Sequence, residues 1–346
     1  MAVAAAALQR IRSSSLIDAI GLLLLAGVLL FLLLKFFEDP TRFLNVAIIG
    51  MTNGAIYGLV ALGYTLVYGI LQLINFAHGD VFALSGLVSS TMIVSVLDIS
   101  EDASVFFIVF GLLATLAVTI PLFAVLNATI ERIAYKPLRS APRLAALITA
   151  VGVSFIVQNF SLAVYGVDFE SVPNFIPRTP AIEIGDVVIQ WNKLAVFMIV
   201  IPVLVVLTWF VRSTRQGKAM RAVAQDKEAS AMMGIDVNRT ISVTFFLAGS
   251  LAAVAGLVYL LQFNIRYDTG FELGLIAFTA AVLGGIGNLT GAVLGAMFIG
   301  MVQAFNEGLD GTPGGDWTRS IVFGILIAVL VFRPEGILGE RTPEGA

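Results

Sequence analysis

The chain of 346 residues contains no cysteine, a single histidine and few charged side chains. The lack of cysteine excludes disulfide bonds and thiolate metal sites. Charged residues make up only 12% of the chain, whereas 58% are hydrophobic, and the mean hydropathy is +0.96. Because a soluble domain carries about 25% charged residues, this composition indicates an integral membrane protein. The net charge of −3 points to no partner, since the charges fall almost wholly in loops.

A long polar segment that could fold as a separate aqueous domain is also missing. Apolar stretches recur from end to end, and a helix needs about 20 mostly apolar residues to cross a bilayer. We therefore predict an all-α integral membrane protein with about 8–10 transmembrane helices. The expected spans are 16–34, 44–70, 81–97, 104–126, 144–165, 194–211 and 240–264, followed by shorter runs at 273–286, 289–305 and 319–332 that either cross or re-enter.

The first stretch follows Arg10 and Arg12, as the apolar region of a signal peptide would. We expect a retained helix instead, because no small-residue cleavage site follows it and residues 35–40 look like a plain loop. If the chain crosses the membrane at each span, successive loops lie on alternate sides. One side then holds 14 of the 20 Lys and Arg residues and both termini. Cytoplasmic loops hold such an excess of basic residues, so both termini are expected in the cytoplasm.

The expected spans contain almost no ionisable residue away from their ends, since Asp18 and Arg319 lie near span termini. Proton- and cation-coupled carriers usually keep carboxylates or histidines at mid-membrane, where such groups are costly, to bind the driving ion. The polar residues that do occur, such as Gln158 and Gln303, are uncharged. The pattern therefore indicates that the energy for transport does not come from an ion that binds within these spans.

Small residues recur at helical spacing in three places. These are Gly50, Gly54 and Gly58, then Ala248, Ala252 and Gly256, and finally Gly291 and Gly295. Such faces let helix backbones approach closely in a membrane. Packing within this subunit is the favoured interpretation, and an interface with another subunit is the alternative.

Two clusters interrupt the apolar pattern. The first holds Asn75, His78 and Asp80, and the second holds Gly284, Gly285, Gly287 and Asn288. Backbone groups freed by a broken helix are tolerated at membrane depth only inside protein or beside a watery cavity, and one break in each half is typical of transporters with an internal inverted repeat. We predict that these residues shape a translocation pathway or gate.

Two other interpretations of the first cluster remain open. His78 and Asp80 can instead lie in a cytoplasmic-side turn and cap a helix that starts at Val81. A membrane-embedded hydrolase would need a nucleophile and a base within reach, and Ser85 near His78 and Asp80 is the candidate for it.

The loop 212–239 contains a second type of candidate site. No Gly or Pro occurs from Lys218 to Met233, and apolar residues recur near one face, which predicts one short helix ending at Gly234. Exposed methionines adapt well to a partner surface, whereas an amphipathic helix lying on anionic lipid is the alternative. The residues that we assign to this site are Lys218, Arg221, Asp226, Glu228, Ala229, Met232, Met233 and Gly234.

Glu228-Ala229-Ser230, with Gly234 shortly after, resembles the EAA loop of ABC importer permeases, with Ser230 in place of the usual alanine. Four further stretches are similar to LivH-type permeases of branched-chain amino acid ABC importers. They are Gly63-Tyr-Thr-Leu-Val-Tyr-Gly69, Ile74-Asn-Phe-Ala-His-Gly79, Glu131-Arg-Ile-Ala-Tyr-Lys-Pro137 and Ala277-Phe-Thr-Ala-Ala-Val-Leu-Gly-Gly-Ile-Gly287. The resemblance covers about residues 44–339, which divides the chain into an extra N-terminal helix and loop (1–43), a permease domain (44–339) and a tail (340–346).

The resemblance implies a pathway subunit, not an enzyme, in the bacterial inner membrane. Its implied partners are a second, LivM-like permease, two cytoplasmic ATPases held by the EAA-like loops, and an extracytoplasmic solute-binding protein. ATP and Mg²⁺ would bind to the ATPases, and this chain, which has no phosphate-binding Gly-x-x-x-x-Gly-Lys-Ser/Thr loop, is expected to hold no cofactor and no nucleic acid. Branched-chain or other neutral amino acids are the expected substrates, and the alternatives are a permease for a small neutral solute such as urea or an ion-coupled secondary carrier.

Overall fold

The computed structural model describes residues 21, 23, 26–139, 141–333 and 335–339. The tail 340–346 and most of residues 16–25 lie outside the described residues. The long helices are α2 (Pro40–Leu71), α3 (Ala77–Thr91), α4 (Val105–Ile130), α5 (Arg143–Tyr165), α6 (Trp191–Ser213), α9 (Val237–Leu260), α10 (Thr269–Gly284), α11 (Leu289–Gly308) and α12 (Gly315–Phe332). The short elements are the π-helical turns η1 (Met92–Val96) and η2 (Glu131–Tyr135), the 3-10 turn η3 (Lys136–Leu138), helices α7 (Arg215–Gln225) and α8 (Lys227–Met232), and strands β1 (Pro180–Ile184) and β2 (Val187–Gln190).

The predicted all-α membrane fold is confirmed. Among the described residues, eight helices are long and apolar enough to cross a membrane, and α10 is a shorter apolar helix of 16 residues. Several helices begin three or four residues before the predicted spans, namely α2, α3, α6, α9, α10 and α12. At the start of α9 the side chain of Asp236 accepts a hydrogen bond from the backbone N–H of Arg239. The sequence also gave no sign of the antiparallel β1–β2 hairpin in the loop after α5.

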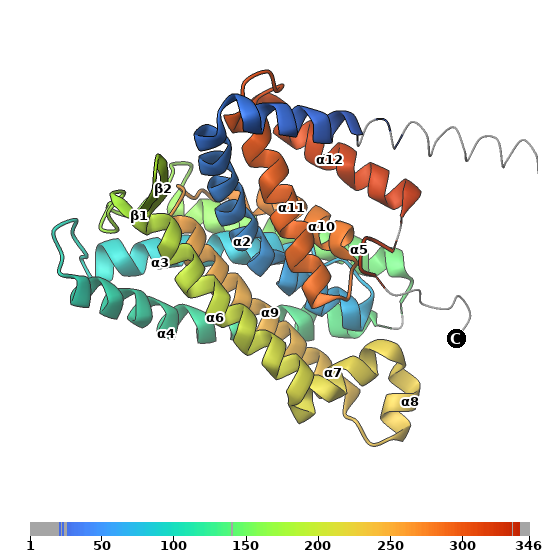
Figure 1. The fold of residues 1–346 in the computed structure, drawn as a ribbon. Helices are drawn as coiled ribbons and strands as arrows, with labels where there is room; N and C mark the ends of the chain where they lie inside the picture. Colours follow the sequence, from blue (N-terminus) through green and yellow to red (C-terminus); the bar gives the residue numbers. More distant parts are fainter. Residues whose placement is uncertain (1–20, 22, 24–25, 140, 334, 340–346) are drawn as a thin grey trace, which may run out of the picture.

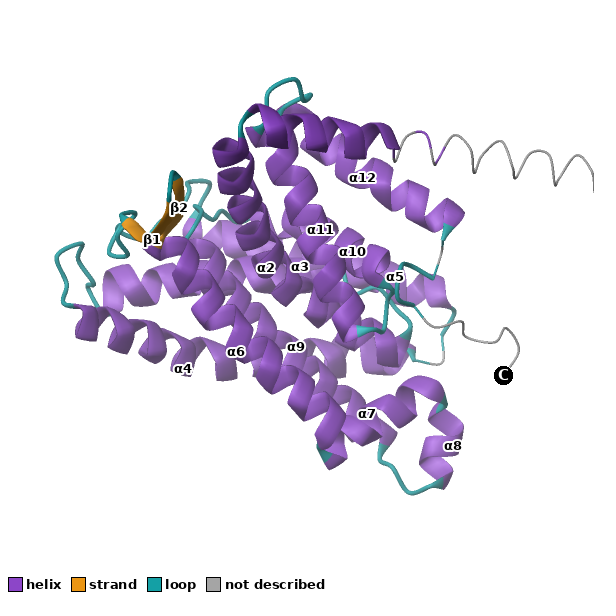
Figure 2. Cartoon of the chain, in the orientation of Figure 1, coloured by secondary structure: helices purple, strands orange, loops and turns teal. Residues whose placement is uncertain are grey.

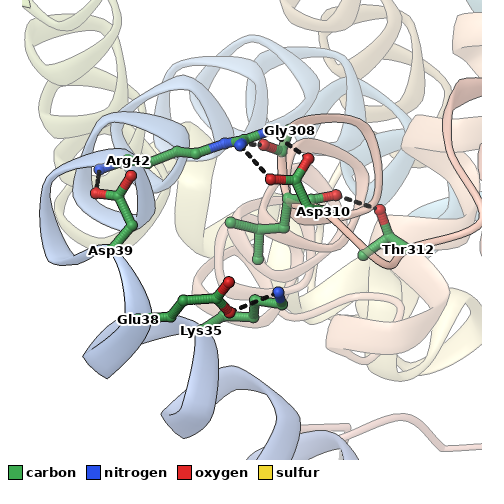
Figure 3. Close-up of polar contacts among 8 residues, drawn as sticks. Lys35, Glu38, Asp39, Arg42, Gly308, Asp310 and Thr312 are labelled. Carbon is green, nitrogen blue, oxygen red and sulfur yellow. Dashed lines mark hydrogen bonds and ion pairs between the residues drawn. The ribbon is translucent and has the colours of Figure 1, made fainter.

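Local sequence explains where α2 starts and stops. The side chain of Asp39 accepts the backbone N–H of Arg42 at 2.8 Å, and Pro40 occupies the first turn, where a missing N–H costs nothing. Arg42 also binds both carboxylate oxygens of Asp310 and donates to the carbonyl of Gly308, which ties the start of α2 to the loop after α11 (Figure 3). At the other end Gln72 adopts a left-handed conformation with φ of 55°, which stops the helix.

The core of the bundle lies around α2, which packs along α11, α9 and α10. Close backbone contact makes this packing possible: a Cβ atom at Gly54 would lie 2.7 Å from Cα of Met297, and one at Gly50 would lie 2.9 Å from Cα of Met301. On α9, Gly256 likewise packs against the backbone of α3 around Phe82 and Gly86. The small-residue faces therefore serve packing within this subunit, as favoured from the sequence.

An outer layer surrounds this core. In the apolar spans of α4, α5, α6 and α12 only 11–22% of the residues are buried, whereas 67–89% are buried in those of α2, α3 and α9. Apolar surface of this extent on a single chain is the mark of contact with lipid or with another membrane subunit. The outer helices thus form the surface of the subunit within the bilayer.

The bundle has two distinct ends. The β1–β2 hairpin and the loop 97–104 lie at one end, and α7 and α8 project from the other (Figures 1 and 2). This agrees with the chain path, because α6 begins directly after β2 and ends just before α7. The predicted inside loop 212–239 and the predicted outside loop 166–193 therefore lie on opposite sides of the bundle.

The contact between α2 and α11 leads to the first testable prediction. A Cβ atom at Gly300 would lie 2.6 Å from Cα of Gly54, whereas one at Gly58 would meet only the Cβ of Ala296, at 3.8 Å. We expect Gly300→Ala to separate the two helices and lower the stability by about 1–3 kcal/mol, and Gly58→Ala to be tolerated. Thermal aggregation of the detergent-solubilised protein, followed by gel filtration, measures both; equal midpoints for the two variants would contradict this packing.

Candidate functional site

The first interrupted segment forms a buried polar turn between α2 and α3. Asn75 is 3% exposed, and its side-chain carbonyl accepts a hydrogen bond of 2.7 Å from the hydroxyl of Tyr135. The backbone carbonyl of Asn75 accepts the N–H of His78 at 3.1 Å, which starts α3. Asn75 is thereby fixed between the α2–α3 turn and the π-helical turn η2.

His78 lies fully buried within the first turn of α3. Its ring stands edge-on to the ring of Tyr64, with 5.0 Å between centroids, and fills the space that a side chain at Gly63 would occupy. Neither ring nitrogen has a well-aligned hydrogen-bond partner among the described residues. His78 therefore packs as a buried polar ring against α2 at Gly63.

Asp80 is also buried, at 1% exposed, and one of its carboxylate oxygens accepts a hydrogen bond from the hydroxyl of Ser154 on α5. The other oxygen has no partner among the described residues. The hydrogen bond joins α3 to the outer helix α5. Between His78 and Asp80, Gly79 allows α10 to approach, because a Cβ atom there would lie 3.0 Å from Cα of Gly274.

The alternative in which His78 and Asp80 cap a helix from Val81 is wrong. Both residues lie inside α3, and the residue before it, Phe76, makes no side-chain cap. The hydrolase arrangement also finds no support in the geometry, because the hydroxyl of Ser85 lies 2.6 Å from the carbonyl of Phe82 and 2.8 Å from that of Ala252. Ser85 thus serves the contact between α3 and α9.

The second interrupted segment joins α10 to α11. Gly285 and Gly287 have positive φ of 104° and 96°, which an L side chain rarely adopts. Asn288 caps α11 by accepting the N–H of Gly291 at 3.0 Å, and its amide donates to the carbonyl of Leu338 at 2.9 Å. Gly284 lies so close to the backbone of Gly291 that a Cβ atom there would overlap it.

Backbone groups released at the end of α10 are paired by the C-terminal segment. The carbonyl of Leu283 accepts the N–H of Ile337 at 2.8 Å, and that of Gly284 accepts the N–H of Leu338 at 3.1 Å. The two interrupted segments also lie close together, since Ile74 before α3 and Ile286 after α10 line one small pocket. The structure therefore brings both predicted clusters to one end of the bundle, and their role in transport stays a prediction.

A second buried polar group lies at the same end, on η2. The carboxylate of Glu131 is fully buried; it binds the guanidinium of Arg139 and accepts the hydroxyl of Ser242 at 2.7 Å. Arg139 also binds the side chain of Asn238 in the first turn of α9. The π-helical turn thus places Tyr135 toward Asn75 and Glu131 toward α9, and π-helical turns occur often at functional sites.

The predicted single helix from Lys218 to Met233 was wrong. It consists of two helices, α7 and α8, separated by Asp226, whose carboxylate accepts the N–H groups of Glu228 at 2.8 Å and Ala229 at 2.9 Å. An aspartate that caps a new helix needs extended backbone, so α7 ends where α8 begins. Asp226 is therefore a structural cap, a role that was not predicted from the sequence.

α7 is anchored to the bundle. Thr214 caps it by accepting the N–H of Gly217 at 3.0 Å, Met220 and Val223 are buried against the core, and Arg221 donates to the carbonyl of Val211. Lys218 on the same helix is exposed.

α8 presents the opposite character, because most of its side chains are free. Met232 and Met233 are 82% and 83% exposed, and Glu228 is exposed with no partner among the described residues. Gly234 has φ of +81°, as predicted for the residue that ends this helix. Ala229 is half-buried, so the exposed surface runs from Glu228 to the two methionines.

Three residues that hold these sites together, Tyr135, Ser154 and Glu131, were not predicted as site residues, and Asp226 was assigned to the loop site without its capping role. Only Asp226 carried a usable local signal, an Asp directly before an alanine-rich helical segment. The other three are ordinary polar residues in apolar spans, and their partners come from distant helices, so spacing along the chain does not reveal them.

An apolar helical bundle with buried polar connections at one end defines the class: a multi-pass membrane protein. The family model described as "Branched-chain amino acid transport system / permease component" matches residues 46–331. The chain therefore belongs to this family of transport permeases.

Individual relatives support this assignment. The chain is 36% identical to the high-affinity branched-chain amino acid transport system permease protein BraD of Pseudomonas aeruginosa, over 88% of this chain and 98% of BraD. It is 35% identical to the corresponding permease protein LivH of Escherichia coli, over 89% of this chain and 99% of LivH. The solved structure of PsaBC from Streptococcus pneumoniae in complex with Fab is 13% identical and aligns with a TM-score of 0.42 over 89% of this chain and 97% of that one.

The hydrogen bond between Tyr135 and Asn75 gives a prediction about the site. Tyr135→Phe keeps the ring but leaves the buried Asn75 amide without its partner, which costs about 1–3 kcal/mol. Tyr165→Phe is the matched control, because among the described residues its hydroxyl accepts a hydrogen bond only from the half-buried Thr91, at 3.3 Å. Thermal unfolding in detergent should show a clear loss for Tyr135→Phe and less than about 1 kcal/mol for Tyr165→Phe; equal losses would show that the buried contact does not hold the turn.

Proposed function

We propose that this chain is the pathway subunit of an ATP-driven ABC importer that moves branched-chain or other neutral amino acids across the bacterial inner membrane. The observation that carries the proposal is the family match over residues 46–331, together with two amino acid permease relatives that align along almost their whole length. The substrate class is proposed from the names of these relatives. A neutral amino acid also suits a chain whose expected spans lack charged residues at their centre.

The proposed orientation puts the α7–α8 end in the cytoplasm. The basic residues of α7 and its flanks, including Arg212, Lys218 and Arg221, agree with the excess of positive charge on that side. Both chain termini then lie in the cytoplasm, and the β1–β2 hairpin faces outward. A solute-binding protein would deliver the substrate to this outward face.

The proposed energy source is a pair of cytoplasmic ATPases, which bind ATP and Mg²⁺ and contact α8. Two features of α8 support this contact. First, its exposed methionines and unpaired Glu228 offer apolar surface and a hydrogen-bond acceptor to a partner. Second, α7 is anchored in the bundle by Met220 and Val223, so a force on α8 reaches the membrane helices instead of bending a free loop. The lipid-surface alternative fits less well, because α8 has only six residues and exposes Glu228 beside the methionines.

A second permease completes the proposed complex. The exposed apolar faces of α4, α5, α6 and α12 leave room for a LivM-like subunit or a second copy of this chain, with lipid around the rest. Asn159 is exposed within the apolar helix α5, where its amide donates to the carbonyl of Phe155 at 2.8 Å. Because a polar side chain that faces lipid is costly, α5 is the favoured side for this contact.

The α8 contact can be tested by strain at Gly234. A valine with φ of +81° is strained by about 1–3 kcal/mol, and open space around the residue means that strain is the only direct effect. We expect Gly234→Val to insert normally but to lose transport and to release the ATPases during purification, with Glu228→Ala acting in the same direction more weakly.

The chain offers a matched control on the opposite face. Gly185, in the turn of the β1–β2 hairpin, also has positive φ, 63°, and open space around it. Gly185→Val introduces the same strain there and should leave the ATPases bound. If Gly234→Val retains the ATPases and transports at the normal rate, α8 is not the coupling element.

A further inference from the structure

A polar pocket opens at the outward end of the bundle, opposite α7 and α8. It lies between the chain segment 171–178 and the C-terminal end of α9, with the start of α6 as its third side, and it has a volume of about 170 Å³. The polar side chains that line it are Ser171, Asn174, Arg178, Asn192, Gln262 and Asn264. No other function described above uses this pocket.

Arg178 differs from the other arginines that the structure describes at this end. Arg42 binds Asp310, Arg266 binds Asp268, and Arg319 binds Glu272. Arg178 has no carboxylate partner among the described residues, and no acidic residue lines the pocket. Its positive charge is therefore available to an anionic group that enters.

Another part of the pocket lining has the opposite polarity. Leu260 and Leu261 line the pocket at the C-terminal end of α9. The last carbonyl groups of a helix carry partial negative charge and attract cations. Within the described part of the chain, the backbone carbonyls of these two residues accept no hydrogen bond beyond the helix. The pocket thus offers a positive group and a partially negative group to a single small ligand.

Hydrogen bonds hold these walls in place. The amide of Gln262 donates to the backbone carbonyl of Asn192 at 2.7 Å, and the amide of Asn192 donates to the side chain of Gln262 at 3.3 Å. Glu170 and Ile265 exchange backbone hydrogen bonds of 2.8 and 2.9 Å, which fix the segment before Ser171 to the chain after α9. The pocket is therefore formed before a ligand arrives, which lowers the ordering cost of binding.

We propose that this pocket binds the zwitterionic head of an α-amino acid, with the carboxylate on the guanidinium of Arg178 and the ammonium group at the C-terminal carbonyls of α9. The inference rests on the proposed function and adds to it a receiving site on the permease itself. Guanidinium groups bind carboxylates through paired hydrogen bonds. In this arrangement the aliphatic side chain of the bound amino acid points out of the pocket. The pocket therefore recognises amino acids as a class and not one particular amino acid.

The test is direct binding to the full chain, co-purified with its membrane partners in lipid nanodiscs and without solute-binding protein. Saturation-transfer NMR compares leucine with leucinamide, which lacks the carboxylate, and with 4-methylpentanoate, which lacks the ammonium group. We expect leucine to bind at least about 10-fold more tightly than either analogue, since one charge-assisted hydrogen bond contributes that much. Leucine binding no tighter than that of leucinamide would overturn the proposal.

Variants then locate the site. Arg178→Gln should weaken leucine binding about 10-fold or more and leave leucinamide binding unchanged, with partial rescue by Arg178→Lys. Arg266→Gln removes an equal charge close to the pocket, but that arginine is already paired with Asp268, whose hydrogen bonds raise its pKa. It should change leucine binding by less than about twofold.

Two results would contradict the inference in different ways. If Arg178→Gln leaves leucine binding intact, the pocket is not the site. If leucine does not bind and Arg178→Gln instead weakens capture of the purified solute-binding protein, Arg178 meets a carboxylate of that protein and not of a free amino acid. In either case ATP-driven uptake by the unaltered complex would still support the proposed function, so the two claims fail separately.

Discussion

In the hydrocarbon layer every backbone N–H and C=O needs a partner inside the protein, and this constraint governs the end of the bundle where the two interrupted segments lie close together. The carbonyls of Leu283 and Gly284, released where α10 ends, are taken up by the N–H groups of Ile337 and Leu338. Asn288 then caps α11 and binds the same C-terminal segment. The C-terminal segment is therefore part of the site, because without it the turn after α10 would leave carbonyl groups unpaired.

The same constraint links the interrupted segments to the cytoplasmic helices. Asn75 is held by Tyr135, and Glu131, one helical turn earlier on η2, is held by Ser242 on α9 and by Arg139. Since α9 follows α8 after a short turn, the proposed ATPase contact lies one helix away from these buried bonds. A displacement of α8 and α9 acts on a buried ion pair whose loss is costly, which suits a device that transmits movement to the α2–α3 turn.

The sequence predicted the fold well where the signal was local. Long apolar runs gave α2, α4, α5, α6, α9, α11 and α12, because a membrane span is defined by its own composition. The positive φ of Gly234 followed in the same way from its place at the end of a predicted helix. Failures arose where two local tendencies competed: the capping side chain of Asp226 ended a helix that alanine content alone would have continued. Tertiary contacts such as Asp80 with Ser154 join residues 74 positions apart, and one sequence holds no pattern that pairs them.

The central claim is that energy reaches this chain through contact with ATPases and not through an ion that binds within the bundle. Asp80 is the candidate for binding such an ion, since one oxygen of its buried carboxylate has no partner among the described residues. The most direct measurement is leucine uptake into proteoliposomes that contain the complete complex, the solute-binding protein and a constant supply of ATP, with and without ionophores that collapse the proton and sodium gradients. The account predicts uptake that needs ATP and continues unchanged with the ionophores; uptake that stops with the ionophores while ATP is held constant would contradict it.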